Sequence, residues 1–125
     1  MPKILLVTPS PASLATLSAA LLAMPEVKIA WVSAGEQALA AAAESRPDLI
    51  VVDEQIRDMS AQSLLNRLLL WDAMVNTAVV SGRSEEDFHE FYEGLGIMAQ
   101  LPLHPGRAEA EQLMRRLGEL SPAVD

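Results

Sequence analysis

The chain has 125 residues, a formal net charge of -8 at pH 7 and hydrophobic residues at half of its positions. This length suits one domain with a substantial core, and the negative charge argues against nucleic acids and anionic membranes as partners. The chain has no cysteine, which excludes disulfides and thiolate metal sites and fits a cytoplasmic protein.

Five short apolar runs alternate along the chain with five patterns of helical periodicity. Strands are predicted at 3–7, 27–32, 48–53, 77–81 and 98–103, and helices at 13–24, 35–44, 61–71, 85–94 and 108–117. Ser33, with Glu36 three residues later, predicts a capping box at the second helix, and Ser84 precedes an acidic first turn. Gly94 and Gly96 predict the end of the fourth helix.

Strict alternation of strands and helices predicts an α/β fold, a flavodoxin-like three-layer α/β/α sandwich around a five-stranded parallel sheet. The third strand is apolar at four successive positions and belongs in the centre of the sheet. Right-handed crossovers then favour the strand order 2-1-3-4-5. This domain takes in residues 1–120, and residues 121–125 are expected to form a tail. We also expect no signal peptide and no membrane span.

The predicted strand order places a crevice between the first and third strands, at their carboxyl ends. The third strand ends there in a carboxylate, Asp53, whereas the residues after the first strand include no acid. The other residues expected to line the crevice are Thr8, Pro9, Ser10, Ser81 and His104. The sequence therefore predicts a polar site with a single carboxylate at its centre.

The order and spacing of these features resemble the receiver domain of bacterial response regulators, over about residues 2–118. In that family the third strand ends in the phosphoacceptor aspartate, which corresponds to Asp53 here. The family's next loop has the pattern D-x-x-M-P-x-M-D-G; Met59 fits it, whereas Arg57 and Ala61 depart from it. The fourth strand ends in Ser81 and a glycine, where the family has threonine or serine and a small residue.

The resemblance also implies residues that this chain replaces. Receivers follow the first strand with two acids that hold Mg²⁺, and Thr8 and Pro9 stand at those positions here. The family's lysine before a proline corresponds to His104 if one residue is inserted before the fifth strand, and otherwise to Leu103. The aromatic residue that usually precedes this lysine is replaced by the glutamine at position 100 or the leucine at position 101.

These replacements weaken the case for phosphorylation of Asp53. Magnesium is usually held through one or two carboxylates, and Asp53 is the obvious anionic ligand, since Asp58 is expected to point towards solvent. Loss of one preorganised charge-stabilising group costs roughly 10²–10³ in rate. We therefore expect neither a cofactor nor Mg²⁺, and we expect Asp53 to be a strand-end residue hydrogen-bonded to Ser81 or Thr8.

The fourth helix carries three of the few aromatic residues of the chain, Phe88, Phe91 and Tyr92. Their spacing does not allow all three rings to point into the core. One interpretation is two buried rings and one partly exposed ring, and the other is an interface. The resemblance implies that the fourth helix, fifth strand and fifth helix form a face for dimerisation or for a protein partner.

Three hypotheses for the function remain open. The first is a degenerate receiver, a pseudo-receiver without enzymatic activity, which acts as an interaction or dimerisation module in phosphorelay signalling. The second is an active receiver that a histidine kinase phosphorylates on Asp53. The third is a small flavodoxin-like protein that binds a flavin or a nucleotide at residues 8–13, although two prolines there remove backbone N–H donors.

Overall fold

The computed structural model describes residues 2–120, and a parallel sheet forms its centre. Its strands are β1 (Lys3–Val7), β2 (Lys28–Val32), β3 (Leu49–Asp53), β4 (Thr77–Val80) and β5 (Ala99–Leu101). They are ordered β2-β1-β3-β4-β5, which confirms the predicted fold and topology. β3 is buried along its whole length because β1 and β4 flank it and helices cover both faces. The predicted tail at 121–125 lies outside the described residues.

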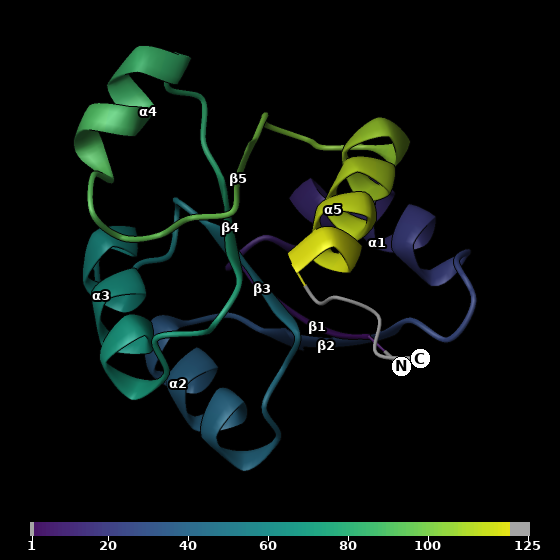
Figure 1. Cartoon of the computed structure of the whole chain (residues 1–125), viewed down its shortest axis with the longest axis horizontal. Helices are drawn as coiled ribbons and strands as arrows, with labels where there is room; N and C mark the ends of the chain where they lie inside the picture. Colours follow the sequence, from purple (N-terminus) through teal and green to yellow (C-terminus); the bar gives the residue numbers. More distant parts are fainter. Residues whose placement is uncertain (1, 121–125) are drawn as a thin grey trace.

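Helices cover both faces of the sheet (Figure 1). They are the 3-10 helix η1 (Pro11–Leu14), α1 (Ala15–Leu22), α2 (Gly35–Glu44), α3 (Ala61–Trp71), α4 (Glu85–Phe91) and α5 (Arg107–Leu120). α1 and α5 lie on one face and α2 and α3 on the other, whereas α4 stands apart at one end of the sheet (Figure 1). No helix within residues 2–120 has the length and apolar character needed to cross a bilayer.

Successive residues of the central strands point to opposite faces of the sheet and build two separate cores. Leu5 and Ile50 belong to the core under α2 and α3, together with Phe88 and Tyr92 from the α4 region. Leu6 and Val51 belong to the core under α1 and α5. Both cores are made mainly of leucine, isoleucine, valine and alanine. Among the described residues, the buried aromatic rings, Phe88 and Tyr92, both lie in the core under α2 and α3.

The ends of several elements differ from the prediction. The helix expected from residue 13 begins as a 3-10 turn, with Pro11 at its first position. β5 is shorter than predicted and ends before Pro102, which has no N–H to donate to a sheet. α4 ends at Phe91, also earlier than predicted, and Gly94 (φ 83°) and Gly96 (φ 63°) lie in the left-handed region after it.

The N-terminus of α2 is capped by a distant residue. Ser33 lies before the N-cap position and does not form the predicted capping box. Instead, the Asp58 carboxylate accepts the backbone N–H groups of Gly35 at 2.8 Å and Glu36 at 3.0 Å. The hydrogen bonds from Glu36 and Gly35 hold the pKa of Asp58 below its ordinary value. A lowered pKa stabilises the fold above the unfolded-state pKa, and this contribution is lost as the pH falls through the folded value.

Candidate functional site

Asp53 lies at the carboxyl end of β3 and is 4% exposed. The Thr8 hydroxyl donates a hydrogen bond to Oδ2 at 2.6 Å, and the backbone N–H of Gln55 donates to Oδ1 at 2.9 Å. The Ser13 hydroxyl lies 3.5 Å from Oδ2. Both carboxylate oxygens therefore have donors from the protein itself, and a charge-assisted bond of 2.6 Å is a strong one.

Thr8, which is 1% exposed, is fixed at the end of β1 by its neighbours. Its backbone N–H donates to the Val32 carbonyl at 3.0 Å, and its hydroxyl oxygen accepts the Ser10 N–H at 3.0 Å. Its hydroxyl has one proton, and the Asp53 oxygen is closer than the Ser10 carbonyl, which lies at 3.2 Å. Pro9, half-buried next to Thr8, has no N–H to add to this site.

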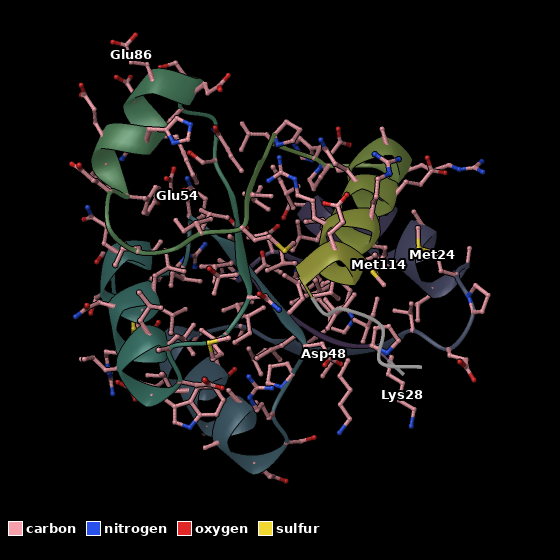
Figure 2. All side chains as sticks on the ribbon, viewed as in Figure 1. Met24, Lys28, Asp48, Glu54, Glu86 and Met114 are labelled. Atoms are coloured by element: carbon pink, nitrogen blue, oxygen red, sulfur yellow. The ribbon has the colours of Figure 1, made fainter. Side chains whose placement is uncertain are left out.

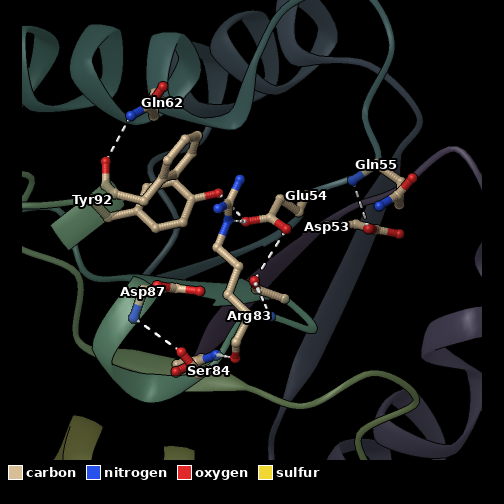
Figure 3. A network of polar contacts seen from close by, with 11 residues as sticks. Asp53, Glu54, Gln55, Gln62, Arg83, Ser84, Asp87 and Tyr92 are labelled. Carbon is tan, nitrogen blue, oxygen red and sulfur yellow. Dashed lines mark hydrogen bonds and ion pairs between the residues drawn. The ribbon is translucent and has the colours of Figure 1, made fainter. Parts of the chain in front are cut away.

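Ser81, at the end of β4, is 2% exposed and donates to Glu54 rather than to Asp53. The Ser81 hydroxyl lies 3.1 Å from Glu54 Oε1. Arg83 Nε donates to Glu54 Oε2 at 3.0 Å, and the Tyr92 hydroxyl donates to the same oxygen (Figure 3). Of the two partners predicted for Asp53, the structure therefore selects Thr8, and it places Ser81 in a separate cluster around Glu54.

The phenol of Tyr92 stays protonated in this cluster. Burial, followed by the hydrogen bond to the Glu54 carboxylate, raises the pKa of Tyr92 well above its ordinary value. Tyr92 therefore acts as a hydrogen-bond donor throughout the physiological pH range. Its ring packs against Phe88, with ring centroids 4.7 Å apart, so the polar tip of the side chain meets Glu54 while its body is in the core.

The residue at the end of the fifth strand is neither His104 nor Leu103, the two residues predicted there. β5 ends at Leu101, which is 1% exposed and precedes a proline, so the residue before the strand-end proline is apolar. His104 lies beyond the strand, is exposed and has a left-handed backbone (φ 52°). Within residues 2–120, no hydrogen bond or ion pair joins His104 to Asp53. Leu103 is 56% exposed and packs beside Gly82.

The three aromatic residues near α4 divide into two buried rings and one partly exposed ring. Phe88 and Tyr92 are 5% and 4% exposed, so they belong to the core and are not available to a partner. Phe91 is 38% exposed, and the Arg83 guanidinium carbon lies 3.6 Å from the centroid of its ring. Of the three interface candidates, Phe91 alone keeps an exposed ring.

Glu54, Arg83 and Gln100 also contribute to the site, although the sequence did not predict them as site residues. Gln100 Nε2 donates to the Arg83 carbonyl at 2.8 Å, which ties β5 to the loop before α4. The one signal in the sequence is the position of Glu54 directly after Asp53. The described residues contain no group of three His, Cys, Asp or Glu side chains arranged to hold a metal ion.

Comparison with known proteins relates this geometry to a fold. No family model and no curated protein matches the chain. A receiver domain of an HD domain-containing protein from Pseudomonas fluorescens Pf-5 is 21% identical, with 96% of this chain and 89% of that chain covered and a TM-score of 0.82. A CheY-like receiver domain protein from Methanospirillum hungatei JF-1 is 18% identical, with 97% of each chain covered and a TM-score of 0.84.

The chemotaxis response regulator CheY4 of Vibrio cholerae gives a similar result. It is 17% identical, with 94% of this chain and 98% of that chain covered and a TM-score of 0.83. At these identities the likeness establishes the fold, which is the flavodoxin-like fold of response-regulator receiver domains.

Proposed function

We propose that the chain is a receiver-like domain of two-component signalling which acts as a protein-interaction module without Mg²⁺-dependent phosphorylation. One observation carries this proposal. The carboxylate at the phosphoacceptor position, Asp53, is 4% exposed and bonded through both oxygens to protein donors, with Thr8 at 2.6 Å. In this arrangement a metal or a phosphoryl group at Oδ2 of Asp53 would compete with the Thr8 hydroxyl.

The charges around Asp53 support the same proposal. An aspartyl phosphate carries about -1.5 to -2 charges in place of the single charge of the carboxylate, and these charges need cations or a metal nearby. Thr8 and Pro9 provide no carboxylate to hold Mg²⁺, and the buried Leu101 provides no cation at the end of β5. The guanidinium of Arg83 is already paired with Glu54 at 3.0 Å. A phosphoryl group on Asp53 would therefore be buried without a cation or a metal to balance its negative charge.

The proposed interaction face consists of α4, β5 and α5. Its apolar residues include Phe91, which is 38% exposed, and Leu103, which is 56% exposed and follows β5. The first turn of α4 is entirely acidic, with Glu85, Glu86 and Asp87. Two copies meeting through this turn would bring like charges together, which favours a protein partner with basic and apolar groups over a second copy.

The alternative is an active receiver phosphorylated on Asp53 by a histidine kinase. The position of Asp53 at the end of β3, within a receiver fold, favours it. A flavin or nucleotide site at residues 8–13 has less support, because the donors of this loop are used within it. The Ser10 N–H bonds to Thr8, and the Ser13 N–H and hydroxyl bond to the Ser10 carbonyl.

Magnesium should leave the stability of the protein unchanged. A site with a Kd of about 1 mM would add about 1.4 kcal/mol at 10 mM MgCl₂, since a ligand stabilises by RT ln(1 + [L]/Kd). For a domain of this size that is a rise of roughly 4–6 °C in the thermal midpoint. We expect a change below about 1 °C when MgCl₂ is added to the wild-type protein at constant ionic strength.

The matched control restores the missing acids. In Thr8→Asp/Pro9→Asp, three carboxylates would meet at one edge of the sheet and lower the thermal midpoint by mutual repulsion. Mg²⁺ should raise that midpoint again in the variant. A rise of several degrees in the wild-type protein would instead show a metal site and contradict the proposed function.

A further inference from the structure

We propose that the Glu54 carboxylate fixes α4 from inside the fold, so that the arrangement of α4 is set by Glu54 and is independent of Asp53. This inference deepens the proposed function, on which it rests, because α4 belongs to the proposed interaction face. It assigns to Glu54 the part of an internal anion that holds the face in one state without phosphorylation. Glu54 is thus a positioning residue.

α4 needs an anchor because it is short and stands apart. It has seven residues, and isolated helices below about 12–15 residues are marginal in water. In Figure 1 it lies at the end of the sheet, beyond α3 and apart from α5, and is joined to the sheet by loops on both sides. Phe88 is the single buried residue within the helix, and Tyr92 is its C-cap. Figure 2 shows Glu86 projecting from its outer side.

Glu54 supplies that anchor by bonding to three segments at once. Ser81 follows β4, Arg83 lies in the loop before α4, and Tyr92 is the C-cap of α4; all three donate to the Glu54 carboxylate (Figure 3). The side chains of Glu54 and Arg83 are 18% and 35% exposed. Because the pair is partly buried, solvent and salt screen it less than they would on an open surface. Charge-assisted hydrogen bonds are also roughly twice as strong as neutral ones.

A second set of contacts holds the same segments together. Gln62 Nε2, from α3, donates to the Phe91 carbonyl at 2.6 Å. The Arg83 guanidinium covers the Phe91 ring at 3.6 Å, and Arg83 also donates its backbone N–H to Ser81 Oγ at 3.1 Å. The last turn of α4 is therefore bound from α3, from the end of β4 and from Glu54. In these contacts Glu54 supplies the negative charge.

The two adjacent carboxylates have separate partners. The donors to Asp53 are Thr8 and Gln55, and the Ser13 hydroxyl lies 3.5 Å away; none of the three bonds to Glu54. The one proton of the Ser81 hydroxyl is given to Glu54. A change at Asp53 therefore has no hydrogen-bonded route to α4 through Ser81 unless the bond between Ser81 and Glu54 breaks first.

Hydrogen–deuterium exchange of the wild-type protein and four variants tests this inference. In Glu54→Gln the shape of the side chain is kept and its charge is lost, so amides of residues 85–95 should exchange about tenfold faster, while those of β3 change much less. Tyr92→Phe should give a smaller increase, because it removes one donor. Glu86→Gln, with the same change of charge on the outer side of α4, and Asp53→Asn should leave α4 at the wild-type rate.

Two results would overturn the inference. One is wild-type exchange of α4 in Glu54→Gln, and the other is an Asp53→Asn variant whose α4 exchanges as fast as that of Glu54→Gln. Exchange after treatment with an acyl phosphate separates this inference from the proposed function. A phosphorylated protein with unchanged α4 exchange would refute the proposed function alone, whereas faster exchange on phosphorylation would refute the role of Glu54.

Discussion

Replacing Phe88 by alanine is expected to lower the free energy of unfolding by about 3–5 kcal/mol, the usual cost of truncating a buried phenylalanine. Phe88 is 5% exposed and lies in the core that α2 and α3 cover. It also packs against Tyr92, whose hydroxyl binds Glu54, so its loss removes the apolar part of the α4 anchor. Urea unfolding measures the effect as a shift of the midpoint at unchanged slope.

Phe91→Ala is the matched comparison from the same helix. Phe91 is 38% exposed, and its ring contacts the Arg83 guanidinium and packs edge-on against Tyr92. An exposed cation–π contact is worth about 0.5–1 kcal/mol and an aromatic pair about 0.5–1.5 kcal/mol, so Phe91→Ala should cost about 1–2 kcal/mol, less than Phe88→Ala. Equal costs for the two variants would mean that α4 is rotated from the orientation described here, with Phe91 in the core.

Thr8→Val should lower the free energy of unfolding by about 1.5–3 kcal/mol, because it removes a hydrogen bond to a buried charge without a change of shape. The variant removes the close donor to Asp53 Oδ2; the Ser13 hydroxyl lies 3.5 Å from this oxygen and donates to the Ser10 carbonyl at 2.7 Å. Chemical denaturation of Thr8→Val, Asp53→Asn and the double variant gives the coupling between the two residues.

The sign of this coupling follows from the charge. Thr8→Val should cost less in the Asp53→Asn background, since the stranded acceptor is then neutral, and the coupling should reach about 1–2 kcal/mol. Additive costs would show that the Thr8 hydroxyl stabilises the end of β1 through the Ser10 N–H, which it accepts at 3.0 Å. In that case the hydroxyl would not be the group that holds the Asp53 carboxylate.

Most of the fold is predictable from the sequence, because apolar periodicity reports the face that each segment buries. The bounds of α2 and α3 agree with the prediction at 35–44 and 61–71, as does the strand order. The errors arise where a residue distant in the sequence caps the end of a helix. Ser33 has the chemistry of an N-cap, yet Asp58, from the loop after β3, reaches the first N–H groups of α2.

One part of the site, the pair of Thr8 and Asp53, was predictable from the sequence. Parallel strands bring their carboxyl ends together, so the meeting of Thr8 with Asp53 follows from the topology. The role of Glu54 does not, because its carboxylate could turn to solvent unless Arg83 and Tyr92 are already placed beside it. The partner of Ser81 was open for the same reason, since two carboxylates lie next to each other at the end of β3.

Asp53 is proposed not to act as a phosphoacceptor, and the intact mass of the purified protein tests this proposal most directly. The protein is incubated with a small acyl phosphate, with and without Mg²⁺, beside Asp53→Asn and an active receiver that has the two acids. We predict no adduct on this protein under conditions that phosphorylate the active receiver. A gain of about 80 Da, the mass of one phosphoryl group, that is lost in Asp53→Asn would contradict the account.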